Sequence, residues 1–295
     1  MFGLEFNLFN NEYFIYERLI VLVASLIPSI LLLIIALYTD RKSKEPMKNI
    51  LICLGSGILT IALSKYLEEL VMPYISNNII LIYIWAFIEE LSKLLIFVLF
   101  IFDNKYYDEI YDGIVYMALI ALSFAGLENI MYAFSESTVI DSISLALMRD
   151  FTTVPLHIFC GIVIGHFMSL ANFSKEKNIK IKNMILAIFI SSLIHGTFNL
   201  SMNFFSIIDQ TNPIVTLLFI LMPMLLIIFI IFYGSYKITD KNLDLNYIYM
   251  NNKEYEEKYN YLMNKKEYLD SSLRRKQIKF YNINTFNRSD NNDIK

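Results

Sequence analysis

Apolar residues fall in long blocks along this chain, and short polar segments separate the blocks. Each block runs for about 18–25 residues, the length that a helix needs to cross ~30 Å of hydrocarbon. The pattern therefore predicts an all-α, polytopic membrane protein whose transmembrane helices, about seven in number, form a bundle. The expected spans cover residues 17–37, 47–67, 79–102, 112–134, 143–170, 183–202 and 213–236.

Composition agrees with this class of protein. Of the 295 residues, 56% are hydrophobic, whereas a soluble domain would have roughly 45–50%. The two cysteines, Cys53 and Cys160, lie within apolar blocks, so we expect buried thiols and no disulfide framework. The first residues are acidic and not basic, and the following apolar run is long enough to span. We therefore expect the first helix to be retained and not removed as a signal peptide.

Lysine and arginine are distributed unevenly between the predicted loops. The loops of one side contain Arg41, Lys42, Lys44, Lys48, Lys105, Lys175, Lys177, Lys180 and Lys182. The other side has only Lys65, with Arg18 and Arg149 near the ends of their spans. The positive-inside rule then places the N-terminus outside and the C-terminus in the cytoplasm. Residues 237–295 are expected to form a charged, partly disordered cytoplasmic tail after a membrane domain of residues 1–236. No nucleic-acid signature is present in the sequence.

Three charged residues interrupt the third predicted span. Glu89 and Glu90 lie four and three residues before Lys93, so both carboxylates can face one lysine on a helix surface. One interpretation is an internal ion pair that lets charges survive in the membrane. The other makes one glutamate a general base, with the lysine holding the second. Two adjacent like charges in a low dielectric do not both ionise easily, so one carboxylate is suited to accept a proton from water.

Two further spans carry polar groups at helical spacing. On the fourth span, Phe124 and Glu128 are four residues apart and share a face. Glu128 alone would serve equally well as a hydrogen-bonding anchor between helices. On the fifth span, His157 alone would be an ordinary interhelical hydrogen-bonding group, and Gly161 and Gly165 continue its face. Such small residues let another helix approach closely.

The sixth span places His195 and Asn199 on one face, again four residues apart. An imidazole and a carboxamide can bind a water molecule from one side and an oxyanion from the other. At 1.5 Å per residue, Glu89, Glu128, His157 and His195 lie about 9–20 Å below the outer ends of their spans. Four helices that present polar groups over one range of depth predict a polar intramembrane cavity, open to the outer face.

At these residues the chain resembles the PrsW family of bacterial intramembrane proteases, within the superfamily that includes type II CAAX prenyl proteases. The family pattern combines a Glu-Glu-x-x-Lys helix, a Phe-x-x-x-Glu-Asn helix, a helix with one histidine followed by spaced glycines, and a His-Gly-x-x-Asp/Asn helix. The matching residues here are Glu89, Glu90, Lys93, Phe124, Glu128, Asn129, His157, Gly161, Gly165, His195, Gly196 and Asn199. The match runs from about Asp40 to Asn199 in the same order.

The resemblance implies an enzyme in the bacterial cell membrane that cleaves a single-pass membrane protein, typically an anti-sigma factor. In that scheme a first cut near the extracytoplasmic side starts a cascade that frees an alternative sigma factor. Two versions of the chemistry stay open. His157, His195 and a glutamate could hold one zinc ion with an open fourth position. Against this, the chain has no His-Glu-x-x-His helix, and the related CAAX enzymes resemble glutamate-dependent hydrolases.

The resulting hypothesis is that Glu89 or Glu90 activates a water molecule held by His157 and His195. Asn199 or a histidine would stabilise the oxyanion. Lys93 would hold the unused glutamate and Glu128 would orient one histidine or share the proton, with Phe124 and Asn129 supporting the site.

Two other functions compete with this hypothesis. A proton-coupled transporter would need Gly/Pro-interrupted helices in matching halves, and the sequence does not show them. A non-catalytic protein that binds a membrane partner would be free to lose some of the Glu, His and Asn positions, yet the set is complete.

Overall fold

In a computed structural model of the chain, residues 14–39, 45–174 and 176–207 are described, together with residues 233, 237 and 238. This part of the chain folds into helices and contains no strand. The helices are α1 (Ile15–Thr39), α2 (Met47–Val71), η1 (Met72–Tyr74), α3 (Asn78–Phe97), η2 (Val98–Phe102), α4 (Ile110–Ala133), α5 (Val139–Phe151), α6 (Thr153–Asn172) and α7 (Lys177–Ile207). The all-α, polytopic architecture predicted from the apolar blocks is thus confirmed.

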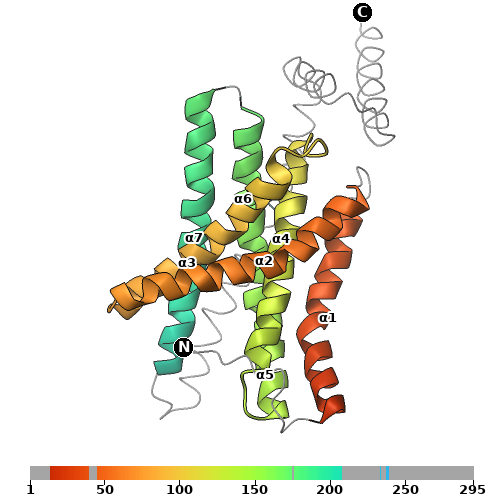
Figure 1. Ribbon diagram of the computed structural model, residues 1–295, viewed down its shortest axis with the longest axis vertical. Coiled ribbons are helices and arrows are strands. Elements are labelled where there is room, and N and C mark those ends of the chain that lie inside the picture. The colour runs from red at the N-terminus through yellow and green to blue at the C-terminus, as the bar shows by residue number, and fades with distance from the viewer. Residues whose placement is uncertain (1–13, 40–44, 175, 208–232, 234–236, 239–295) are drawn as a thin grey trace, which may run out of the picture.

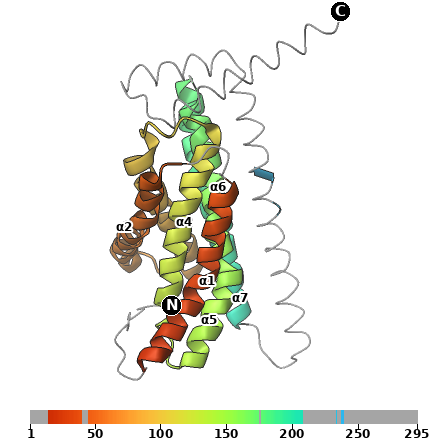
Figure 2. The same ribbon diagram turned by 90° about the vertical axis from the view of Figure 1, so that its right-hand side faces the viewer.

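Helices α4 and α6 form the centre of the bundle. Helix α6 packs against α4 and α7, whereas α1 packs against α4 and α5. Helices α2 and α3 form a hairpin that runs obliquely across the other helices (Figure 1). Figure 2 shows that α1 and α2 lie on either side of α4. The oblique hairpin brings α3 against α7 as well as α4, so one helix can present side chains to both.

Glycines let the two central helices approach closely. A Cβ atom added to Gly165 would clash with the backbone of Gly113 on α4, and one added to Gly161 would clash with Ala121 and the carbonyl of Met117. Neither backbone can move away cheaply, so larger residues would force α4 and α6 apart. The expected role of the α6 glycines as a close-packing face is confirmed.

The loops that follow η2 and α6 lie together at one end of the bundle (Figures 1 and 2). Tyr107, in the loop after η2, shares a hydrogen bond of 3.0 Å with Ser169 in the last turn of α6, and Ser169 donates to the carbonyl of Ile110 at 2.6 Å. Burial raises the pKa of Tyr107, so its phenol stays neutral and serves as a hydrogen-bonding group. This end carries Lys105 and the lysines at the start of α7, and we refer to it as the lysine-rich end.

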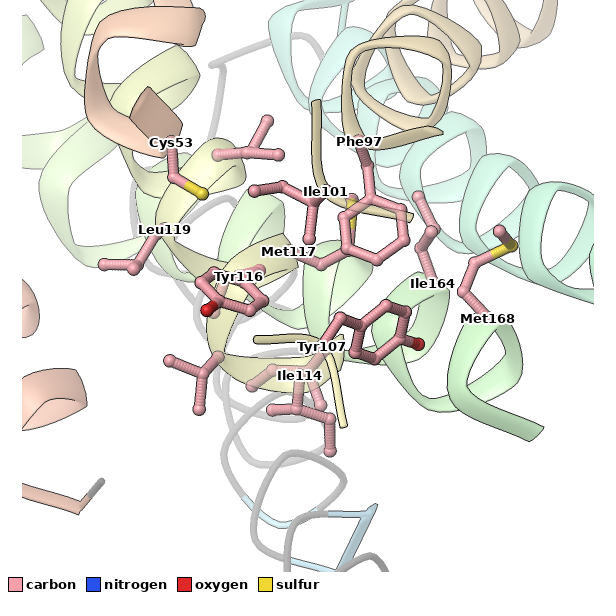
Figure 3. Packing of buried hydrophobic residues seen from close by; sticks show 14 of the residues in the cluster. Cys53, Phe97, Ile101, Tyr107, Ile114, Tyr116, Met117, Leu119, Ile164 and Met168 are labelled. Atoms are coloured by element: carbon pink, nitrogen blue, oxygen red, sulfur yellow. The ribbon is translucent and has the colours of Figure 1, made fainter. Parts of the chain in front are cut away.

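The apolar core fills the half of the bundle near the lysine-rich end. Figure 3 shows side chains from several helices packed there, among them Phe97, Ile114, Met117 and Ile164. Cys53 belongs to the same core. Both cysteines are buried and free, as the sequence predicted.

The helices differ from the expected spans in two respects. Five helical segments are long and apolar enough to cross a membrane within the described part of the chain, and α3 is not one of them. It is as hydrophobic as the others, but it has three charged residues near its middle, Glu89, Glu90 and Lys93. The expected fifth span is two helices, because Thr152 leaves helical geometry (φ −123°, ψ −67°) between α5 and α6. The expected span 213–236 and nearly all of the tail 237–295 lie outside the described residues.

Candidate active site

Ionisable side chains from α3, α4, α5, α6 and α7 meet inside the bundle. We call this group the polar cluster, and its members are Glu89, Glu90, Lys93, Glu128, Arg149, His157 and His195. All seven are buried. Glu128 lies 18 residues beyond the start of α4, roughly 27 Å along the helix, so the cluster occupies the half of the bundle away from the lysine-rich end. Six of its members were predicted site residues, and the structure brings them together.

Glu90 is at the centre of the cluster. Its Oε1 atom accepts a hydrogen bond from the Lys93 ammonium at 2.7 Å and contacts His195 Nδ1 at 2.8 Å. The carboxylate therefore has a buried counter-ion on its own helix and an imidazole from α7. Because Glu90 and Lys93 have no exposed surface, water contributes nothing to their solvation, and each depends on the other to remain charged.

His157 has hydrogen-bond partners at both ring nitrogens. Its Nδ1 lies 2.9 Å from Lys93 Nζ, and its Nε2 lies 3.0 Å from Glu128 Oε2. An ammonium has no lone pair, so Nδ1 must accept the bond from Lys93 and Nε2–H must donate to Glu128. The network assigns this tautomer. His157 also packs edge-on against His195, with ring centroids 4.8 Å apart.

Arg149 supplies the counter-ion of Glu128. Its NH2 group lies 2.7 Å from Glu128 Oε2, and the guanidinium stacks on the ring of Tyr132 at 3.9 Å from the centroid. From the sequence, Arg149 is expected only near the end of its span and is not a predicted site residue. The available signal was a cation one residue before Asp150 in an apolar segment. Spacing along one helix could not connect that cation to a glutamate on another helix.

Glu89 is the carboxylate without a buried cation bonded to it. Its Oε2 atom is buried and has no hydrogen-bond partner among the described residues. The nearest imidazole nitrogen, His195 Nε2, lies 3.8 Å from this oxygen. That separation is too long for a direct hydrogen bond, so both atoms can bond to a shared water molecule instead. His195 donates a hydrogen bond from Nδ1–H to Glu90. Its Nε2 atom therefore carries the lone pair of the neutral imidazole, and this lone pair faces Glu89.

The three remaining predicted residues have different surroundings. The ring of Phe124 lies beneath Lys93 Nζ at 4.4 Å and packs edge-on against His157, so it forms the floor of the cluster. Asn129 is turned away from the cluster: its Nδ2 atom donates to Asp150 Oδ1 at 2.9 Å and to backbone carbonyls of α1 and α5. Asn199 lies one turn beyond His195, is half-buried, and makes no hydrogen bond with the polar cluster.

A tight contact between α3 and α7 lies beside His195. The ring of Tyr83 packs directly on Gly196, where any Cβ atom would overlap it. Tyr83 Oη also lies 3.2 Å from Thr197 Oγ1. Gly196 therefore has a structural role: it lets α3 come close enough to α7 for Glu89 and Glu90 to reach His195.

Glu89, His157 and His195 also form a candidate metal site. Each offers one ligand atom, and these atoms lie within 4.8 Å of one another. Two imidazoles and a carboxylate are a ligand set of zinc hydrolases. The unpartnered Oε2 of Glu89 fits a metal ligand. His157 would have to exchange one of its two hydrogen bonds for the metal, because Lys93 and Glu128 occupy both nitrogens.

The chain is similar to known proteins over most of its length. Residues 31–232 match the model of the PrsW family of intramembrane metalloproteases. A protein named Protease PrsW from Clostridioides difficile is 30% identical over 166 residues, which cover 54% of this chain and 69% of the relative. The Oceanobacillus iheyensis protein of the same name is 28% identical and covers 77% of this chain and 99% of the relative.

The Bacillus subtilis protein named Protease PrsW is 26% identical over 61% of this chain and 81% of its own length. No solved structure matches the chain. The matched region contains every member of the polar cluster. With most of its length matched by the family model, and with these relatives, the chain belongs to the PrsW family of intramembrane proteases.

Proposed function

We propose that this intramembrane protease hydrolyses a peptide bond with a water molecule activated by Glu89. The observation that carries the proposal is the buried Oε2 atom of Glu89, which has no hydrogen-bond partner among the described residues and faces His195 Nε2 at 3.8 Å. A water molecule between these two atoms would have a carboxylate to receive one proton and an imidazole lone pair to hold the other.

Charge pairing favours Glu89 over Glu90 as the base. Lys93 neutralises Glu90 and Arg149 neutralises Glu128, each through a contact of 2.7 Å. Glu89 has no such bond, and Lys65 on α2, which also interacts with it electrostatically, is held by Glu68 at 2.8 Å. A carboxylate without a bonded cation in a water-poor site takes up a proton more readily than a paired one.

The reaction then follows from the positions of these groups. Glu89 takes a proton from the water molecule while the oxygen of that water bonds to the carbonyl carbon of the scissile peptide. The carboxamide of Asn199, one turn along α7 from His195, is available to donate to the oxyanion that forms. The C–N bond breaks as Glu89 returns the proton to the leaving nitrogen. Glu90, Lys93 and His157 keep their places and hold His195 in one tautomer.

Zinc is the cofactor for which this site has suitable ligands. Glu89, His157 and His195 would hold it, and a bound zinc ion would supply Lewis-acid activation of water. Elemental analysis of the purified protein, with an activity assay after treatment with a chelator, separates the two versions. A stoichiometric ion that is lost together with activity supports the zinc version, and full activity without a bound ion supports the glutamate version.

The proposed substrate is a single-pass membrane protein of the anti-sigma factor type, as the family resemblance implies. The distribution of lysine and arginine supports an N-terminus outside the cell membrane and a cytoplasmic tail from residue 237. In that orientation the polar cluster lies in the outer half of the bilayer. A first cut near the extracytoplasmic side of the substrate would follow.

Reconstitution tests the proposal. The full chain is incorporated into proteoliposomes with a single-pass anti-sigma factor, and the product is identified by mass spectrometry. We expect one discrete fragment from the unaltered protein and from Glu69→Gln, an exposed glutamate on α2. Glu89→Gln should lower the cleavage rate by roughly 10³-fold. Cleavage by Glu89→Gln at the rate of the control would overturn the assignment of the base.

A further inference from the structure

Arg149 lies outside the motif residues on which the site was predicted, yet it bonds directly to one of them. It comes from α5, a short helix that ends one residue before the break at Thr152. Its guanidinium is nine-tenths buried and contacts Glu128 at 2.7 Å. A cation buried this deeply in a membrane-spanning region is costly, and such residues usually serve the function of the protein.

Two features fix the position of the guanidinium. Tyr132, one turn after Glu128 on α4, stacks against it at 3.9 Å. The next residue, Asp150, accepts a hydrogen bond from Asn129 at 2.9 Å, and Asn129 also donates to the carbonyl of Ala146. Helix α5 is thus attached to α4 on both sides of the ion pair, which leaves Arg149 little freedom to turn away from Glu128.

An unbroken series of hydrogen bonds leads from Arg149 to the reacting end of the site. Glu128 accepts a hydrogen bond from the Nε2–H group of His157. His157 Nδ1 in turn accepts a hydrogen bond from Lys93 at 2.9 Å. Lys93 donates a hydrogen bond to Glu90 at 2.7 Å, and Glu90 also accepts a hydrogen bond from the Nδ1–H group of His195 at 2.8 Å. Each member fixes the donor and acceptor roles of the next one. The series ends at His195, whose Nε2 lone pair is thereby fixed facing Glu89.

We propose that Arg149 is a positioning residue of the protease: by holding the carboxylate of Glu128 in place, it fixes the His157 tautomer and, through Lys93 and Glu90, the imidazole that faces the water-activating Glu89. This inference rests on the proposed function. A merely structural ion pair between α4 and α5 would stabilise the fold without setting the chemistry. The two roles therefore differ in what they do to kcat when the fold is intact.

A double-mutant cycle separates the two roles. Arg149→Met, Glu128→Gln, the double variant and Arg149→Lys are assayed in proteoliposomes, and unfolding of each is measured in detergent. We expect Arg149→Met to lower kcat by about 10- to 100-fold, as for partners that orient a functional histidine, with KM unchanged. Arg149→Lys should recover part of the loss. The double variant should be no slower than Glu128→Gln, since Arg149 acts only through that carboxylate.

Lys65→Met is the matched control. It also removes a cation that interacts electrostatically with Glu89 and Glu128, but that cation is bonded to Glu68 and not to Glu128. We expect kcat within about threefold of the unaltered protein, because this partly buried pair is not bonded to the polar cluster. If Lys65→Met matches the loss of Arg149→Met, the effect is one of general charge and the inference is overturned.

Other outcomes also decide the question. Full kcat for Arg149→Met, or a double variant much slower than Glu128→Gln, would overturn the positioning role. Arg149→Met could fail to fold because it leaves the Glu128 carboxylate buried without a cation. The double variant has no such carboxylate, so a comparison of its kcat with that of Glu128→Gln still tests whether Arg149 acts only through Glu128. Activity in Glu89→Gln would instead refute the proposed function, whereas an inactive Glu89→Gln beside a fully active Arg149→Met would refute this inference alone.

Discussion

The two halves of α4 are both buried, and they are buried in different ways. Near the lysine-rich end, the helix packs apolar side chains such as Ile114 and Met117 into the core and places Gly113 against α6. In the other half it presents Phe124 and Glu128 to polar and charged groups from α3, α5 and α6. The first half holds the central helices together by close packing. The second half depends on paired charges whose positions matter for chemistry.

The two kinds of burial predict different responses to substitution. Close packing fails by degrees, because a misfitting side chain shifts its neighbours and costs stability. A buried charge network fails abruptly, because removal of one member leaves another charged and unsolvated. Substitutions in the two halves of the bundle should therefore differ in size and in whether activity or stability suffers first.

The largest expected effect is that of Lys93→Met. The substitution leaves Glu90 buried without its cation, which should lower the free energy of unfolding by about 3–5 kcal/mol and abolish cleavage. Thermal unfolding in detergent measures the first effect, and the proteoliposome assay measures the second. Lys65→Met, which removes a half-exposed lysine, is the reference. Equal stability of the two variants would show that Glu90 does not depend on Lys93.

Gly165→Ala should have an intermediate effect. The added methyl group meets the backbone of Gly113, and the strain should cost about 1–3 kcal/mol of stability. Cleavage by the fraction that remains folded should change little, since the polar cluster is in the other half of the bundle. Gly55→Ala has open space around its Cβ position and should stabilise α2 by up to about 1 kcal/mol. A loss of stability in Gly55→Ala as large as that in Gly165→Ala would contradict the packing argument.

The smallest expected effect is that of Tyr83→Phe. The ring that packs on Gly196 is retained, and only the hydrogen bond to Thr197, 3.2 Å long, is lost. Stability should fall by about 1 kcal/mol or less, with kcat within about threefold because no hydrogen bond to the polar cluster is removed. A tenfold lower kcat in Tyr83→Phe would show that this hydroxyl group takes part in the reaction.

Much of the fold and part of the site could be predicted from the sequence. Apolar blocks gave the helices because their lengths match the bilayer. Spacing of three and four residues gave Glu89, Glu90 and Lys93 a common face, but both glutamates satisfy that spacing and only Glu90 bonds to the lysine. Which of them bonds to Lys93 depends on the side-chain rotamers that contacts with α6 and α7 favour, and one helix alone does not determine those rotamers.

Three features of the structure could not be predicted from the residue pattern along a single segment. The break at Thr152 falls within an apolar block, so a continuous span was the natural prediction. Asn129 follows Glu128 in sequence and was grouped with the site, yet a neighbouring residue on a helix points about 100° away, here toward Asp150. Arg149 reaches the site only because α5 is a separate helix attached to α4. Contacts between helices decide all three.

The central claim is that Glu89 acts on water while Glu90 holds the site together. The most direct measurement compares Glu89→Gln with Glu90→Gln for both cleavage rate and unfolding free energy. The account predicts that Glu89→Gln loses cleavage with its stability within about 1 kcal/mol of the unaltered protein. Glu90→Gln, which leaves Lys93 unpaired, should lose about 3–5 kcal/mol of stability as well. A Glu89→Gln variant that unfolds readily, beside a Glu90→Gln variant that is stable and inactive, would contradict the account by exchanging the two roles.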